Sequence, residues 1–277
     1  MIIDSHIHFW RLARGDNCAI NQKMKQIYLD REPHDLKHLL DLTNVEKIIV
    51  VQGALTHSET LYIIGLSVKF PWIDGIIGWV DPNSCSIEEE ILALKLTGIF
   101  KGIRPVNNED NISIAWLLDQ RLNKCWDILK SENLVLEILL QNPNELPLLT
   151  HFSKTHPKLN IILDHCGKPN IADGKLETWS NDLKYLSENE NVFCKFSGLM
   201  NCAYPSKSIE NISRYSDHVI SVFGSDRLLW GSDWPPLDLA SNYEEWFNIS
   251  LQLLSNLNEN DISKILGQNA QHIYNLK

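Results

Sequence analysis

The first ten residues, MIIDSHIHFW, contain a spacing that could do chemistry, because one residue separates His6 from His8. In an extended strand, side chains at i and i+2 point to the same face, so both imidazoles would project together, with Asp4 one pleat below them. Two converging imidazoles at a strand end are typical of a metal site or of a polar catalytic cluster. The same spacing also arises by chance, so other residues of the chain are needed to distinguish a functional site from coincidence.

Two further residues end apolar runs and could join such a cluster. Asp233, in WGSDWPP, precedes Pro235 and Pro236 and could be a turn former or a general base that activates water. Nearby histidines would set the pKa of that carboxyl. His165, in DHCGKP, could be a buried core histidine, but its position at the end of a predicted strand and before Gly167 favours an open site. Asp233 and His165 are therefore the candidate catalytic residues.

Four residues are candidates for contacting a substrate. Arg104, in KGIRPV, could pair with a neighbouring carboxylate or hold a carboxylate or carbonyl oxygen of a substrate. Gln52 ends the apolar run KIIVVQ and would lie at the same level. Trp10 and Trp234 flank predicted strand ends and could stack on a sugar ring, although packing explains them equally well.

Two charged residues, Glu137 and Lys195, lie within predicted strands instead of at their ends. Charged side chains are rarely buried unless they are paired. One interpretation is therefore an ion pair across the interior of the fold. The other is that both side chains face a substrate, and the sequence favours neither.

Eight short apolar runs, rich in Ile, Val, Leu and aromatic residues, could supply strands that position these side chains. They cover residues 1–8, 47–52, 75–80, 99–104, 134–140, 160–165, 192–197 and 228–233. Most do not alternate in polarity, which is typical of strands covered on both faces in a parallel sheet. Amphipathic segments between them predict helices over 36–43, 59–70, 87–97, 115–132, 182–189, 244–257 and 259–276. Asp261 or Asn260 is the expected N-cap of the last helix.

This alternation predicts a single (β/α)8 barrel domain over residues 1–277. The alternative is a doubly wound open sheet, but the first strand is not followed by a glycine-rich phosphate loop. In a barrel, the carboxyl ends of all strands face one mouth, where chemistry is done. The candidate residues named above would meet there, and the irregular segments 11–34 and 106–115 near the mouth would determine specificity.

The composition narrows the expected partners. A net charge of −10 at pH 7 argues against nucleic acid or an anionic membrane surface and favours a small molecule. Apolar runs are too short for a membrane span, and the two apolar residues after Met1 do not resemble a signal peptide. Six scattered cysteines without a CxxC pair predict reduced thiols in a cytoplasmic protein. A homodimer is among the expected states because barrels often associate.

Together these motifs resemble those of the amidohydrolase superfamily, which carries His-x-His at the end of the first strand, His at the end of the sixth and Asp at the end of the eighth. More narrowly, VVQGALTHSET, GIIGWVD, KGIRPV, LDHCGKP, CKFSGL and WGSDWPP occur in the order typical of its lactonase-like branch. That branch contains sugar lactonases and is related to pyrone-dicarboxylate lactonase. The resemblance spans essentially the whole chain.

The resemblance implies hydrolysis of a small lactone, most simply a sugar aldonolactone of carbohydrate metabolism. It implies Asp233 as general base, Arg104 as a substrate contact, and a metal site formed by His6, His8, His165 and Asp233. Arg104 stands where a carboxylated lysine would bridge two metals, which argues against a binuclear centre and leaves one divalent ion such as zinc, or none.

Two other functions stay open from the sequence. The same barrel could be a metal-dependent decarboxylase or an amide hydrolase, which would require a tightly bound metal. It could also be a non-catalytic barrel that binds a sugar acid. The presence of His6, His8 and His165 together with Asp233 argues against a simple binder, because a binder needs no water-activating base.

Overall fold

The computed structural model describes residues 1–17, 20–105, 113–206 and 208–276. Its strands are all parallel and pair with their neighbours in chain order, from β1 beside β2 to β7 beside β8. They are β1 (Ile2–Ile7), β2 (Val45–Val51), β3 (Ile73–Gly78), β4 (Phe100–Ile103), β5 (Val135–Ile138), β6 (Ile161–Leu163), β7 (Val192–Phe196) and β8 (Leu228–Trp230). This order is that of a (β/α)8 barrel and confirms the predicted fold against the open sheet.

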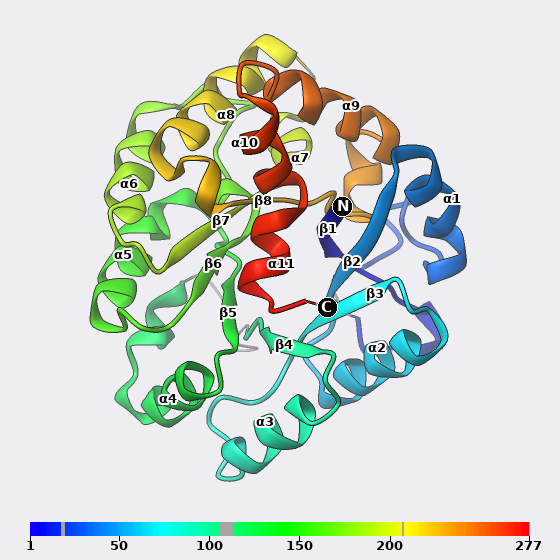
Figure 1. The fold of residues 1–277 in the computed structure, drawn as a ribbon, viewed down its shortest axis with the longest axis vertical. Helices are drawn as coiled ribbons and strands as arrows, with labels where there is room; N and C mark the ends of the chain where they lie inside the picture. The colour runs from blue at the N-terminus through cyan, green and yellow to red at the C-terminus, as the bar shows by residue number, and fades with distance from the viewer. Residues whose placement is uncertain (18–19, 106–112, 207, 277) are drawn as a thin grey trace.

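Helices surround the strands (Figure 1). They are α1 (Pro33–Thr43), α2 (His57–Lys69), α3 (Ile87–Lys95), α4 (Asn123–Ser131), α5 (Leu146–Thr155), α6 (Glu177–Ser187), α7 (Leu199–Ala203), α8 (Ile209–Phe223), α9 (Tyr243–Leu253), α10 (Glu259–Ser263) and α11 (Asn269–Ile273). The continuous helix predicted over 115–132 is wrong, because two short 3₁₀ turns (Ile114–Leu118 and Gln120–Leu122) precede α4. Asp119 separates these turns and caps the second with its side chain.

The closing segment also differs from the single helix predicted over 259–276. A π turn (Lys264–Gln268) joins α10 to α11, so the helical stretch runs from Glu259 to Ile273. Its N-cap is Asn258, whose side chain accepts a hydrogen bond from the Asp261 amide, and the predicted caps at Asn260 and Asp261 are wrong. Both of those residues already lie in the first turn of α10.

The barrel closes where β1 meets the segment that follows β8. The amide of His8 donates to the Trp234 carbonyl (2.9 Å), and the amide of Asp233 donates to the His6 carbonyl (3.0 Å). A Cβ at Gly231 would lie 2.9 Å from the His6 Cβ, so the absence of a side chain allows the two segments to approach. Closure therefore brings Asp233 directly beside the two histidines of β1.

An irregularity in β1 decides which of its side chains face the interior. The register with β2 shifts between Asp4 and Ile7, so the side chains of β1 do not alternate regularly there. Ile3 packs in the barrel interior, whereas Asp4 accepts a hydrogen bond from Tyr243 of α9 (2.8 Å). The prediction that Asp4 lies one pleat below the histidines is therefore wrong, since its carboxylate fixes the closure from outside by accepting from the Ser232 amide (2.9 Å).

The C-terminal helix forms the floor of the barrel. In Figure 1, α10 lies beside the barrel near α8, and α11 lies over the centre of the end that faces the viewer. Ala270, Ile273 and Tyr274 pack against an interior layer of apolar side chains from the strands. That layer consists of Ile3, Ile49, Val51, Ile77, Val135, Ile162 and Leu229. Because this end is filled by packed side chains, the opposite mouth is left for a ligand.

Two further expectations concern the whole molecule. In the described part of the chain, none of the helices is long and apolar enough to cross a membrane. The five cysteines described (Cys85, Cys125, Cys166, Cys194 and Cys202) are free thiols, and Cys18 lies outside the described residues. The predicted specificity segment 106–115 also lies mostly outside them, since 106–112 are not described.

Candidate active site

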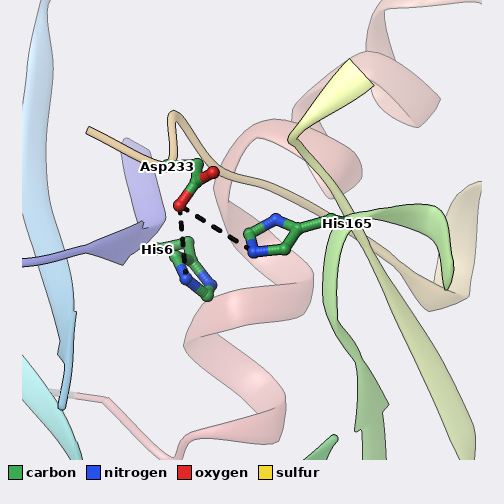
Figure 2. Close-up of side chains that lie close together, drawn as sticks. All are labelled: His6, His165 and Asp233. Carbon is green, nitrogen blue, oxygen red and sulfur yellow. Dashed lines mark ion pairs between the residues drawn. The ribbon is translucent and has the colours of Figure 1, made fainter. Parts of the chain in front are cut away.

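The mouth of the barrel brings three histidines around one carboxylate. Asp233 Oδ1 lies 3.7 Å from His6 Nε2, 3.6 Å from His8 Nε2 and 3.8 Å from His165 Nε2. The rings contact one another edge to face, with centroids 4.8 Å apart for His6 and His8 and 4.5 Å apart for His6 and His165. Figure 2 shows His6, His165 and Asp233 converging from three separate segments. The structure therefore assembles the cluster that the sequence predicted.

Burial sets the charge of this cluster. It lowers the pKa of all three histidines, and at His6 the ammonium of Lys195 lowers it further. Burial alone would raise the pKa of Asp233, but the interactions with His165, His8 and Arg104 outweigh it and hold that pKa below its ordinary value. At neutral pH the site thus contains an ionised carboxylate among neutral imidazoles, which is a suitable state for a general base.

The hydrogen-bond partners assign the proton positions of two of the imidazoles. The Val51 carbonyl can only accept, so His8 Nδ1 carries a proton (2.8 Å) and His8 Nε2 has a free lone pair. The Lys195 ammonium can only donate, so His6 Nδ1 accepts (3.0 Å) and His6 Nε2 carries the proton. His6 Nε2 then donates to His8 Nε2 (3.1 Å). Arg104 Nη1 also approaches His6 Nε2, but at the longer distance of 3.3 Å.

Lys195 and Glu137 form a buried ion pair, which selects the first of the two interpretations that the sequence left open. Lys195 Nζ donates to Glu137 Oε2 (2.7 Å) and lies 3.6 Å from Asp164 Oδ1, and all three side chains are fully buried. Tyr274 from the floor donates to the other Glu137 oxygen (2.6 Å). His6, Glu137 and Asp164 alone would resemble a cation site, but the ammonium of Lys195 already provides the cation there.

Arg104 is held in place by a carboxylate and a backbone carbonyl. Its Nη1 donates to Asp164 Oδ2 (3.1 Å), and its Nη2 donates to the Gln52 carbonyl (2.6 Å). The Gln52 side chain in turn donates to the Arg104 carbonyl (2.9 Å). Gln52 is 1% exposed, so the structure places it where it positions Arg104, and Arg104 is the member of the pair that lines the cavity.

The structure does not bring the two predicted stacking residues to the cavity. Trp10 is 3% exposed, and its indole nitrogen donates to the Leu29 carbonyl (2.8 Å). Trp234 is 2% exposed and packs edge to face on Phe9, with ring centroids 6.1 Å apart. Neither ring is among the residues that line the cavity, so both serve packing in the part of the chain that the structure describes.

A cavity of about 400 Å³ opens beside the cluster. Its lining comprises His8, Arg104, Leu139, His165, Lys168, Gly198, Asn201, Cys202, Asp233 and Pro236. This volume suits a small-molecule ligand. Sequence reasoning missed Lys168 and Asn201, which come from the β6–α6 loop and from the short helix α7. Lys168 directly follows the motif DHCG, and this position could have indicated that it lies near the site. The sequence around Asn201 contains no comparable signal.

The donor set fits a divalent metal ion. His6, His165 and Asp233 each offer a ligand atom, and these atoms lie within 4.8 Å of one another. Imidazole nitrogens and a carboxylate are ligands that zinc prefers. His8 Nε2 lies 3.6 Å from Asp233 Oδ1 and is a fourth candidate donor. His6 would bind an ion through Nε2 only if its proton moved to Nδ1 and the Lys195 ammonium no longer donated there. Asp164 Oδ1 could then accept that proton, since it lies 3.5 Å from Nδ1 and is a buried acceptor without a hydrogen-bond partner in the described residues.

The Lys195–Glu137 pair generates a prediction about stability. Replacing Lys195 by Met leaves the Glu137 carboxylate buried and without its cation. We therefore expect the free energy of unfolding, measured by urea denaturation, to fall by about 3–5 kcal/mol. The double variant Lys195→Met/Glu137→Leu removes both charges and should be more stable than Lys195→Met alone. An equal or greater loss in the double variant would contradict this account.

A matched control is Lys37→Met, which breaks an exposed ion pair with Asp41 on α1. Exposed pairs contribute little to stability, so we expect no measurable change in the urea midpoint of this control. A loss comparable to that of Lys195→Met would mean that charge removal in general, and not burial of the pair, destabilises the protein.

Comparison with known proteins shows the family of this chain. The family model described as Amidohydrolase matches residues 3–276. L-fucono-1,5-lactonase of Burkholderia ambifaria is 34% identical over 278 residues, covering 99% of this chain and 95% of that protein. A crystal structure of an amidohydrolase from Burkholderia multivorans with bound HEPES has a TM-score of 0.93, and one with bound zinc has 0.91; each is 27% identical and covers 100% of both chains. This chain belongs to the amidohydrolase family.

Proposed function

We propose that this protein hydrolyses a small lactone, specifically a sugar 1,5-lactone, with Asp233 as the general base. The observation that carries the proposal is the position of the Asp233 carboxylate at the wall of a cavity, with its Oδ1 within 3.8 Å of the Nε2 atoms of three histidines. The full-length similarity to L-fucono-1,5-lactonase supports this substrate class over the decarboxylase, the amide hydrolase and the non-catalytic binder.

The reaction needs one proton acceptor that later returns its proton. Asp233 takes a proton from water, and the water oxygen attacks the lactone carbonyl carbon to give a tetrahedral intermediate. Collapse of the intermediate breaks the ring C–O bond, and Asp233 returns the proton to the leaving alkoxide. Because that alkoxide stays tethered to the product, one carboxylate can serve both steps. Arg104 supplies positive charge for the carbonyl oxygen as it becomes negative.

The residues that would hold a metal ion are His6, His8, His165 and Asp233, and we propose zinc. When bound, such an ion polarises a carbonyl oxygen and lowers the pKa of water. In the described residues, the contacts of Asp233 with the three imidazoles all involve Oδ1, so Oδ2 stays available to accept a proton.

Replacing Asp233 by Asn removes the general base while keeping the size of the side chain. We expect kcat on sugar 1,5-lactones to fall about 100- to 10,000-fold, with an unchanged melting curve. A pH-indicator assay on a panel of aldonolactones measures this loss.

The matched control is Asp238→Asn, because Asp238 pairs with Arg31 (3.0 Å) and does not line the cavity. Its turnover should stay close to that of the unaltered protein. Near-normal turnover in Asp233→Asn would reject Asp233 as the base. Absence of turnover on every lactone in the unaltered protein would reject the proposed function.

The pH profile should report the ionised carboxylate. A base works only when it is deprotonated, and the lowered pKa of Asp233 keeps it deprotonated well into the acid range. We therefore expect kcat/KM to stay constant from about pH 8 to about pH 5. Its decrease in acid should have a midpoint below the ordinary aspartate pKa of about 4. A loss with its midpoint between about pH 5 and about pH 6.5 would assign the base to a histidine such as His165.

Zinc binding can be measured independently of turnover. Equilibrium dialysis of the chelated protein against zinc should give about one ion per chain, and His8→Ala should weaken the affinity at least about 100-fold because it removes a ligand. The exposed His151 is a matched control, so His151→Ala should bind zinc normally. Equal zinc affinity in His8→Ala and the unaltered protein would reject this donor set.

A further inference from the structure

We propose that Lys168 and Asn201 recognise a ring hydroxyl of the substrate, so that the protein selects polyhydroxylated lactones over bare ones. This inference rests on the proposed lactone hydrolysis and identifies the part of the cavity that would bind the sugar hydroxyls. Both residues line the cavity that contains His165 and Asp233, yet neither belongs to the cluster around the carboxylate.

The first observation is the backbone that presents Lys168. His165, Cys166, Gly167 and Lys168 have φ values of 52°, 52°, 70° and 51°, so four consecutive residues adopt the left-handed conformation. Each of the three non-glycine residues is disfavoured there by contact of its Cβ with the backbone. In one helical turn, residues three apart lie on the same side, so this turn presents His165 and Lys168 together. Both side chains line the cavity, which is consistent with the strain serving the site.

The second observation is that the Lys168 ammonium has no acidic partner in the described part of the chain. Among the described residues, no carboxylate lies within ion-pair distance of its Nζ. Burial lowers the pKa of this lysine, while Cys202, next to Asn201 on α7, and Asp233 oppose the shift. A half-buried cation without a counter-ion in a cavity is available to donate hydrogen bonds to a ligand.

The third observation is an unpaired acceptor on the neighbouring helix. The Asn201 side-chain nitrogen donates to the Pro236 carbonyl (2.9 Å), which fixes the orientation of the amide. The Asn201 oxygen is then a buried acceptor without a hydrogen-bond partner in the described part of the chain. A buried acceptor of this kind is costly unless a ligand or water supplies a donor.

A donor and an acceptor in one cavity match a hydroxyl group. A hydroxyl can accept from the Lys168 ammonium and donate to the Asn201 oxygen at the same time. A carboxylate could use Lys168 but has no proton for Asn201, and an apolar ring carbon would satisfy neither. The chemistry therefore favours a neutral lactone with ring hydroxyls over a lactone that carries carboxylates.

The test compares two lactones that share the reacting ester. One is a hexono-1,5-lactone, and the other is δ-valerolactone, which has the same ring without hydroxyls. We expect Lys168→Met and Asn201→Leu each to lower kcat/KM for the hexonolactone about 10- to 100-fold, mainly through KM. The same variants should lower kcat/KM for δ-valerolactone by less than about threefold, because that ring offers no partner for either side chain.

The matched control is Lys175→Met, which removes an exposed lysine paired with Asp173 on the same β6–α6 loop. This control should hydrolyse both lactones like the unaltered protein, and circular dichroism melting checks that each variant folds. An equal loss on both lactones would overturn the inference, since it would place Lys168 at the reacting carbonyl. Unchanged kcat/KM for the hexonolactone in both variants would also overturn it.

A binding measurement separates this inference from the proposed reaction. If the unaltered protein hydrolyses neither lactone, the proposed function fails, and calorimetry with 1,5-anhydroglucitol, a hydroxylated ring without an ester, then tests hydroxyl recognition directly. Binding that weakens at least about tenfold in Lys168→Met and Asn201→Leu supports the inference. Absence of binding to the unaltered protein, or equal binding to the variants, would overturn it.

Discussion

The ammonium of Lys195 is the interaction on which the rest of the structure depends. It is fully buried in the barrel, where it neutralises Glu137 and fixes the acceptor side of the His6 ring. Glu137 also accepts from Tyr274 on the floor, so one cation links the helix that closes one end of the barrel to the chemistry at the other. A barrel usually fills this interior with branched apolar side chains. Here a polar column replaces part of that packing, and it holds His6 in a defined tautomer.

The active residues depend on turns that depart from regular structure directly after the strands. β6 ends at Leu163 and β8 ends at Trp230, and His165 and Asp233 follow with φ values of 52° and 62°. A strand continued through either residue would alternate its side chains and direct them elsewhere. The left-handed backbone at these two residues changes the direction of the chain directly after each strand, and both side chains contact His6 of β1. Backbone strain at these positions is consistent with a functional site.

Much of the fold and the cluster could be predicted from the sequence, because apolar runs and polar strand ends are local signals. These signals predict the cluster of His6, His8, His165 and Asp233. The orientation of Asp4 could not be, since a register shift in β1 depends on its pairing with β2. Burial of Trp10 and Trp234 depends on loops that fold over them. Likewise, the positions of Gln52, Lys168 and Asn201 depend on contacts between distant segments. The break in the predicted helix over 115–132, by contrast, comes from a local cap at Asp119 that the helical periodicity does not reveal.

The closure between β1 and the segment after β8 has a consequence for the order in which the protein becomes active. Ser232 and Asp4, which bond across it, lie 228 residues apart in the chain. Contacts this distant in sequence form slowly, because most of the chain must be arranged before they can be made. During synthesis, His6 and His8 leave the ribosome first but lack Asp233 until β8 and its loop have been made. A nascent barrel therefore lacks part of the proposed catalytic cluster until the last strand and the loop after it have been made.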